Sequence, residues 1–152
     1  MLKLGDKIPP PQGISLRGAL LRVEEDHIPQ GGMILALTGS VRDLRPFDRL
    51  KHEFHSLNSM VVSIIGRKPP KPPISKELVK LADSITLVFD PTLSYLRRLG
   101  VVRRTLLGWR VVSTVLVVDR KLIVREIISS LPPELMAVRA LLAVKGSSSG
   151  VA

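Results

Sequence analysis

The hydrophobic residues of this chain fall into short runs that alternate with amphipathic segments. Two β-branched runs, 111–119 and 122–128, are separated by Arg120 and Lys121 and predict an antiparallel hairpin whose turn lacks glycine. Three other runs are apolar almost throughout, as strands buried on both faces of a sheet are: 33–37, 60–65 and 84–89. We therefore expect a sheet in which the run at 33–37 is central.

Helical periodicity follows the first of these buried runs. Ser40 and Asp43 have the spacing of a capping box, but a helix that starts at Ser40 would have Pro46 in its interior and would kink there. The alternative is a regular helix that begins at Asp43. In either case, the apolar residues recur near a period of 3.6 and would face the sheet: Val41, Leu44, Phe47, Phe54 and Leu57.

Capping signals predict three further helices. Asp90 would cap one of them, with Pro91 at its first position and Gly100 as its end. Ser75 would cap another, and Pro133 lies near the start of the last. These two helices are expected over 76–82 and 132–144.

The remaining segments are less regular. Residues 15–26 fit either a short helix or a strand-like segment, because Gly18 weakens the helical pattern. Residues 66–75 are rich in proline and predict a stiff loop, and residues 145–152 predict a flexible tail. We expect a single domain over residues 1–144.

Composition narrows the class of protein. A length of 152 residues, with 45% hydrophobic and 24% charged residues, fits one globular domain. The apolar runs are far shorter than the ~20 residues of a transmembrane helix, and the N-terminus lacks a signal-peptide core, so a soluble cytoplasmic protein is expected. The chain has no cysteine, which excludes disulfides, thiolate metal sites and thiol chemistry. Scarce asparagine and glutamine, with abundant proline and arginine, indicate a thermophilic source.

The formal net charge of +10 is unevenly distributed along the chain. Trp109, beside Arg110, lies in a basic segment between Tyr95 and Arg125 and could stack on an exposed base. Such a segment could bind phosphate-rich polymers, and the alternative is a solvated charged face. Against one acidic residue, Asp119, the segment has eight basic ones: Arg97, Arg98, Arg103, Arg104, Arg110, Arg120, Lys121 and Arg125.

The order of the predicted elements, together with three strings, resembles the peroxiredoxin form of the thioredoxin fold. The strings are LGDKIP at 4–9, LVFDPTLSYLRRLGV at 87–101 and STVLVVDRKLIVREI at 113–127. The resemblance covers roughly residues 1–142. It implies an α/β, thioredoxin-like (peroxiredoxin-type) three-layer sandwich with a central mixed sheet.

The resemblance also implies where a reactive site would lie. In peroxiredoxins a reactive cysteine occupies the first turn of the helix after the first core strand, preceded by a threonine or serine that hydrogen-bonds to it. Ser40 falls at the cysteine and Thr38 at the threonine, although Thr38 precedes Ser40 by two residues rather than three. The activating arginine of the family falls on Ser113, with Arg110 three residues earlier, and the proline-containing loop before the motif is missing.

These departures point away from peroxide reduction. An environment that ionises a thiol does not ionise the much less acidic hydroxyl of serine. Ser40 is therefore predicted to be a helix cap, with replacement of a natural cysteine as the alternative, and no residue is predicted to be catalytic. His52 and His55, one helical turn apart, offer two imidazoles without an evident third ligand, and no Walker or GxGxxG motif occurs. Neither a metal nor a cofactor is predicted.

The sequence thus predicts a cysteine-less peroxiredoxin-like protein, without redox catalysis, that acts as a binding or interaction module. Its expected partner is a second copy or another protein, and not a membrane. Two alternatives stay open. One is a nucleic-acid-associated protein that uses the basic segment 97–125, and the other is a thiol peroxidase, an oxidoreductase, whose cysteine is replaced by Ser40.

Overall fold

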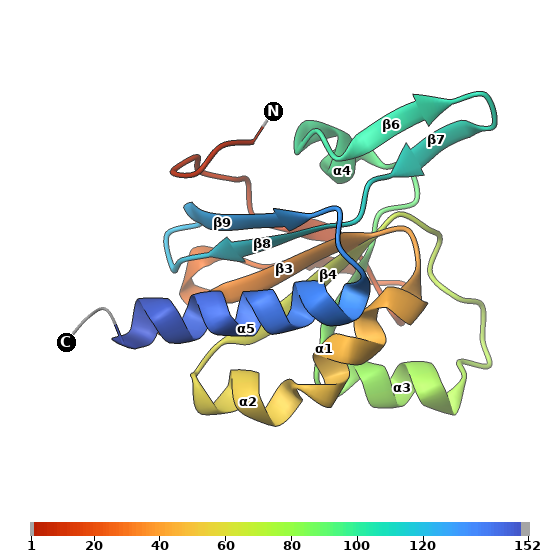
Figure 1. The fold of residues 1–152 in the computed structure, drawn as a ribbon. Helices are drawn as coiled ribbons and strands as arrows, with labels where there is room; N and C mark the ends of the chain where they lie inside the picture. Colours follow the sequence, from red (N-terminus) through yellow and green to blue (C-terminus); the bar gives the residue numbers. More distant parts are fainter. Residues whose placement is uncertain (1, 150–152) are drawn as a thin grey trace.

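The computed structural model describes residues 2–149, and a seven-stranded mixed sheet forms their centre (Figure 1). The strand order is β2-β1-β5-β4-β3-β8-β9. β3, β4 and β5 are parallel, and β8 runs antiparallel to β3. The run at 33–37 is central, as predicted, because β3 lies between β4 and β8. The strands are β1 (Gln12–Ser15), β2 (Leu20–Arg22), β3 (Met33–Thr38), β4 (Met60–Ile65), β5 (Thr86–Phe89), β8 (Thr114–Val118) and β9 (Val124–Ser129).

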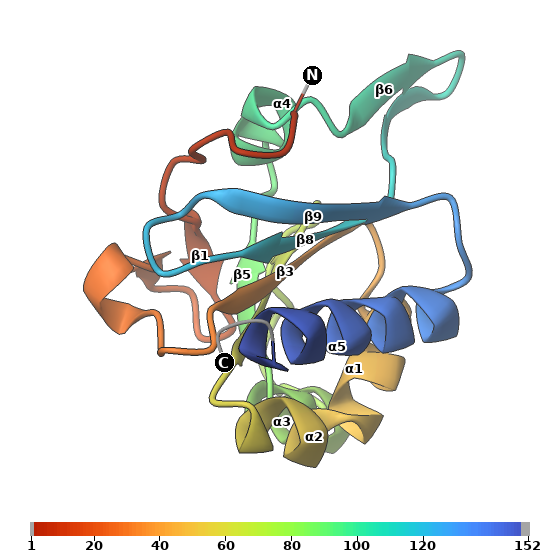
Figure 2. The ribbon, with the colours of Figure 1, turned by 60° about the vertical axis from the view of Figure 1, so that its left-hand side comes forward.

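Different elements cover the two faces of the sheet, and the alternation of side chains along β3 separates the two cores. Ile34 and Ala36 belong to the core under α1 (Arg45–Arg49), α2 (Lys51–Ser56), α3 (Lys76–Ala82) and α5 (Pro133–Ser149). Met33, Leu35 and Leu37 belong to the other core, which includes Ile8 of the N-terminal segment and Tyr95 and Leu96 of α4 (Ser94–Arg98). Figures 1 and 2 show the resulting three layers, with α4 alone among the α-helices on its side of the sheet.

The segment after β3 is not the continuous helix that the sequence predicted. Ser40 caps a 3-10 turn, η2 (Val41–Leu44), and α1 begins only at Arg45. This break places Pro46 in the first turn of α1, where its missing N–H leaves no hydrogen bond unmade. Both predicted starts, at Ser40 and at Asp43, are therefore wrong for a regular α-helix.

α4 also begins later than predicted. Leu93, in the left-handed conformation with φ of 61°, precedes the helix, so Asp90 is not its N-cap. Asp90 lies three residues before the N-cap, Leu93. Its buried carboxylate still accepts a hydrogen bond from the backbone N–H of Leu96, in the first turn of α4, at 3.0 Å. Gly100, with φ of +75°, follows the end of the helix as predicted.

The segments near the two ends of the chain differ from some of the predictions. Residues 12–22 form a β1–β2 hairpin, so most of the segment 15–26 is strand-like, and Glu25 and Asp26 at its end lie in a short 3-10 helix, η1 (Glu25–His27). α5 continues through Ser149, past the predicted boundary at residue 144, and residues 150–152 of the expected tail lie outside the described residues. In the described part of the chain, no helix combines the length and the apolar character needed to cross a membrane.

A hairpin that the sequence did not predict lies inside the basic segment, in addition to the β1–β2 and β8–β9 hairpins. β6 (Val102–Thr105) and β7 (Gly108–Val111) pair antiparallel and project from the body of the protein on the side of α4 (Figures 1 and 2). The basic segment is therefore divided. Five of its arginines lie on α4 and this hairpin, whereas Arg120, Lys121 and Arg125 lie around the turn beyond the far end of β8.

Candidate functional site

The end of β3 brings three polar side chains together, and we call them the Thr38–Asp43–Ser113 cluster. Thr38, the last residue of β3, is 2% exposed, and its hydroxyl donates a hydrogen bond to Asp43 Oδ2 at 3.0 Å. The Ser113 hydroxyl, just before β8, reaches the same oxygen at 3.4 Å. The Thr38 oxygen in turn accepts the backbone N–H of Ser40 at 3.1 Å. The cluster thus links β3, η2 and the start of β8.

Ser40 has a local role in this turn. Its hydroxyl accepts the backbone N–H of Arg42 at 3.3 Å, which makes Ser40 the cap of η2, as predicted. The capping box expected with Asp43 does not form, because Thr38, and not Asp43, accepts the Ser40 N–H. The Asp43 carboxylate is turned instead toward the two hydroxyls of the cluster.

The arginine at this turn is not the one that the sequence indicated. Arg110 lies exposed on β7, where its Cα is paired with that of Arg103. Arg67, directly after β4, donates a hydrogen bond from Nε to the Gly39 carbonyl. Since β3 and β4 are parallel and Thr38 is in register with Ile65, the residues that follow both strands lie at the same edge of the sheet. That rule, applied to Gly66 and Arg67, would have found Arg67 from the sequence.

The base of the β6–β7 hairpin closes over this edge. A Cβ atom on Gly66 would lie 2.7 Å from Val111 Cγ2 and 2.8 Å from Leu93 Cδ2, so a larger side chain there would have to displace these two side chains. Val111 is also within 3.7 Å of the Cβ position of Gly39. The hairpin therefore starts directly above the turn that contains Ser40.

The chemistry open to the cluster is narrow. The Thr38 hydroxyl has two acceptors within the turn, Asp43 Oδ2 and the Ser40 carbonyl, and Arg67 donates to a backbone carbonyl, so neither group is presented to a peroxide. No thiol is present in the chain. A carboxylate that accepts two hydroxyl groups stabilises the turn, because charged hydrogen-bond acceptors contribute more than neutral ones. The arrangement fits a structural role.

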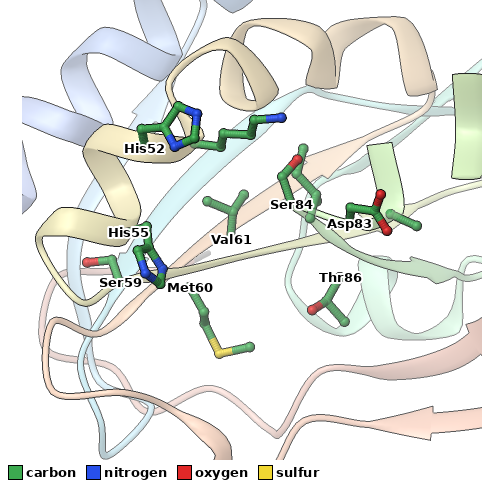
Figure 3. A pocket seen from close by; sticks show the side chains of 11 residues that line it. His52, His55, Ser59, Met60, Val61, Asp83, Ser84 and Thr86 are labelled. Atoms are coloured by element: carbon green, nitrogen blue, oxygen red, sulfur yellow. The ribbon is translucent and has the colours of Figure 1, made fainter. Parts of the chain in front are cut away.

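A pocket of about 350 Å³ lies beside α2, between the helix and the start of β4 and β5 (Figure 3). His52 and His55 reach it from α2, Met60 and Val61 from β4, and Asp83 lies on its opposite side. Within residues 2–149, no three His, Asp or Glu side chains are grouped so that they could hold a metal ion.

A concentration of exposed positive charge lies elsewhere, on a surface that we call the arginine hairpin. It comprises β6, β7 and the last turn of α4, and it contains Arg97, Arg98, Arg103, Arg104 and Arg110. All five are exposed, and none forms an ion pair with a carboxylate in the part of the chain that the structure describes. The sequence between Asp90 and Asp119 contains no acidic residue.

Trp109 lies between two of these arginines. The Arg97 guanidinium carbon is 4.8 Å from the centroid of the ring, and that of Arg104 is 5.8 Å away. Both distances are those of cation–π contacts. The predicted group of Arg97, Arg104 and Trp109 is therefore brought together in space, although Arg97 lies on α4 and the other two on the hairpin.

α4 is a fixed support for this surface. The Tyr95 hydroxyl donates a hydrogen bond to the Pro9 carbonyl at 2.6 Å, which ties the helix to the N-terminal segment. Burial raises the pKa of Tyr95 well above its usual range, with the nearby Arg98 acting in the opposite direction, so the phenol stays protonated. At the base of the hairpin, the Val112 N–H donates to the Val101 carbonyl at 2.7 Å.

Solved structures share this architecture. No model of a protein family matches the chain, and no curated protein matches it in sequence. Peroxidoxin BcpB from Mycobacterium tuberculosis matches with a TM-score of 0.79 at 20% identity, over 96% of this chain and 98% of that chain. This chain has a peroxiredoxin-like thioredoxin fold. The predicted fold class is thereby confirmed.

Two further structures agree. Reduced Prx3 from Vibrio vulnificus gives a TM-score of 0.72 at 16% identity, over 95% of this chain and 99% of that chain. A serine-for-cysteine mutant of peroxiredoxin 6 of Arenicola marina gives 0.75 at 14% identity, over 99% and 76%. At these identities the likeness establishes the fold alone.

In this peroxiredoxin-like chain, two positions could correspond to the reactive cysteine of peroxiredoxins. Counting back from the following strand leads to Ser40, whereas the family's three-residue spacing from Thr38 leads to Val41. Ser40 caps η2, and Val41 begins it. Neither residue carries a thiol. Asp43, whose carboxylate contacts Thr38 and Ser113, was not predicted as a site residue.

Proposed function

We propose that this peroxiredoxin-like protein is a binding module without redox catalysis, and that the arginine hairpin is its working surface. The observation that carries the proposal is the contrast between two regions. The turn after β3 has its polar groups directed at one another, whereas the arginine hairpin presents five exposed arginines that have no carboxylate partner among the described residues.

The hydrogen bonds within the turn after β3 support the absence of redox catalysis. Peroxide reduction by this family would require a thiolate with hydrogen-bond donors aimed at it. Here the Thr38 and Ser113 hydroxyls are taken up by Asp43, and the Arg67 side chain by Gly39. A carboxylate in this place would also disfavour a second negative charge.

Exposure of charge supports the second half. Five arginines without carboxylate partners in the described residues create a positive potential that attracts anionic surfaces and accelerates encounter with them. The same charge disfavours contact between two copies through this surface. The expected homodimer stays a prediction, and it would use another face.

Binding to immobilised heparin, a model polyanion, tests the proposal. One variant replaces Arg97, Arg98, Arg103 and Arg104 with glutamine, and a control with the same net charge replaces Arg17, Arg49, Arg120 and Arg139. We expect the first variant to elute at clearly lower salt than the control, because the loss of clustered charge removes more counterion release. Equal elution of the two variants would mean that only net charge matters, and the proposal would fail.

A nucleic acid is the second candidate partner. Arg103 and Arg110 lie on one face of the hairpin as cross-strand partners, where two guanidinium groups could bind successive phosphates. Fluorescence anisotropy with labelled single- and double-stranded oligonucleotides across a salt series tests this candidate. Affinity that falls steeply with log salt, and that is lost in the four-arginine variant, would support it.

A further inference from the structure

The tip of the arginine hairpin is apolar, and nothing in the fold accounts for this. Leu106 and Leu107 form its two-residue loop, with relative exposures of 106% and 101%. Two-residue hairpin loops usually contain glycine or asparagine, and leucine at both positions has no conformational advantage. Two adjacent leucines in water are a cost that a folded protein normally avoids at a projecting loop.

The conformation of this tip is nevertheless defined. The Thr105 hydroxyl donates to the Gly108 carbonyl at 2.8 Å, and its oxygen accepts the Leu107 N–H at 3.2 Å. Gly108 adopts a φ of 114°, which side chains rarely allow. The loop is thus a formed turn that holds both leucines outward.

Positive charge surrounds the strands behind the tip. Arg103 and Arg110 are cross-strand partners on one face, and Arg104 and Trp109 are partners on the other. These side chains lie two to three residues from the leucines, which is roughly 7–10 Å along a strand. Trp109 is 49% exposed, and it lies at the same level.

We infer that the arginine hairpin docks on the surface of an anionic phospholipid bilayer, with Leu106 and Leu107 inserted between the headgroups and the arginines bound to lipid phosphates. The distance along the strands between the leucines and the basic side chains matches the depth to which interfacial segments insert. An interfacial segment buries its apolar part about 5–10 Å into the headgroup boundary, and arginines and tryptophan favour the headgroup level just outside it. This inference rests on the proposed function and names its partner.

The observations favour a lipid surface over the other anionic partners. A nucleic acid offers nothing to two exposed leucines, and the Trp109 ring on which a base would stack already has two guanidinium groups near it. A second copy of the hairpin would bring like charges together. The sequence alone predicted no membrane partner, because the leucines, the arginines and Trp109 form one surface only after the hairpin folds.

Flotation with phospholipid vesicles tests the inference. Vesicles of phosphatidylcholine alone are compared with vesicles that contain about one-third phosphatidylglycerol. Trp109 is the single tryptophan, so its emission directly reports the environment of the hairpin. We expect binding only to the anionic vesicles, a shift of Trp109 emission to shorter wavelength, and weaker binding at high salt.

The tip is tested by a double variant, Leu106→Ser with Leu107→Ser, and by a matched control. The control is Leu20→Ser on β2, an edge strand of the main sheet, which removes one leucine, 92% exposed, outside the arginine hairpin. We expect the tip variant to bind anionic vesicles about tenfold more weakly and to lose the emission shift, while the control binds normally. Far-UV circular dichroism of each variant establishes that it is folded, and the comparison of the two vesicle types needs no variant.

The outcomes separate this inference from the proposed function. If the tip variant binds anionic vesicles as strongly as the wild type, the leucines do not insert into the bilayer and the inference fails. Heparin binding without vesicle binding, or preferential binding of an oligonucleotide in competition with vesicles, would overturn the lipid partner and leave the arginine hairpin as the working surface. If neither heparin nor vesicles bind, both the inference and the proposed function fail.

Discussion

Among single residues, Asp43 is the one on which the turn after β3 depends. Its carboxylate accepts hydrogen bonds from the Thr38 and Ser113 hydroxyls, and Thr38 is buried. Asp43→Ala should lower the free energy of unfolding by about 1–2 kcal/mol, because a buried hydroxyl loses a charged acceptor. Urea denaturation measures the change. Asp26→Ala, at an exposed carboxylate in η1 (Glu25–His27), is the control, and a loss of equal size there would contradict the role of Asp43.

Ser40 is the residue that tests the peroxidase alternative. In Ser40→Cys the new thiol would lie in the turn of the Thr38–Asp43–Ser113 cluster, with the carboxylate opposing ionisation and Arg67 engaged with Gly39. We expect a thiol pKa at or above its ordinary value of about 8.5 and no peroxide reduction beyond that of a free thiol. The pH dependence of the reaction with a disulfide reagent gives the pKa. Val41→Cys is the companion variant, and rapid peroxide reduction by either would reinstate the enzyme hypothesis.

At the scale of elements, the β8–β9 turn depends on Asp119. Burial disfavours the charged carboxylate, but the N–H groups of Ile123 and Lys121 and the Arg125 guanidinium outweigh it and lower the pKa of Asp119. A lowered pKa in the folded state means stabilisation that is complete above the unfolded pKa of about 3.9 and is lost as the pH falls through the folded value.

Asp119→Asn should therefore cost about 1 kcal/mol of unfolding free energy at neutral pH, a modest figure because the pair with Arg125 is partly exposed. The difference from the wild type should shrink below about pH 4. Urea denaturation at a series of pH values measures it. A difference that stays constant with pH would assign the loss to the geometry of the turn rather than to the charge.

The elements differ in how well the sequence predicts them, for physical reasons. β3 and β4 are predicted correctly because strands buried on both faces require unbroken apolar runs. The β6–β7 hairpin is missed because it is buried on neither face, so its arginines and its Leu106–Leu107 loop show no alternation and no common turn signal. α4 is displaced because Leu93 adopts a left-handed conformation that its residue type does not indicate.

The candidate site was predictable only in its local part. The capping role of Ser40 follows from residue type and position, because a cap acts within its own turn. The contact of Ser113 with Asp43, and that of Arg97 with Trp109, join residues that are distant in sequence. Such contacts depend on how the layers pack, and periodicity within one segment carries no information about them.

For the whole molecule, the two cores are complete without the projecting part of the arginine hairpin. No residue from 103 to 110 belongs to either core, whereas Val102 and Val111 at its base pack against the core on the α4 side. Replacing residues 103–110 with Asn-Gly would rejoin Val102 and Val111 through a two-residue turn that favours a hairpin. We expect the unfolding free energy to change by less than about 1 kcal/mol, because no buried contact is lost.

This prediction separates a structural from a functional reason for the hairpin. Urea denaturation and far-UV circular dichroism measure the fold, and heparin and vesicle binding measure the surface, on the same shortened protein. Suppose that the shortened protein is stable but no longer binds. The two fully exposed leucines and three arginines between Val102 and Val111 of the natural chain would then serve contact with a partner, because they add nothing to folding. A loss of more than about 2 kcal/mol would instead make the hairpin part of the fold, and its exposed tip would need another explanation.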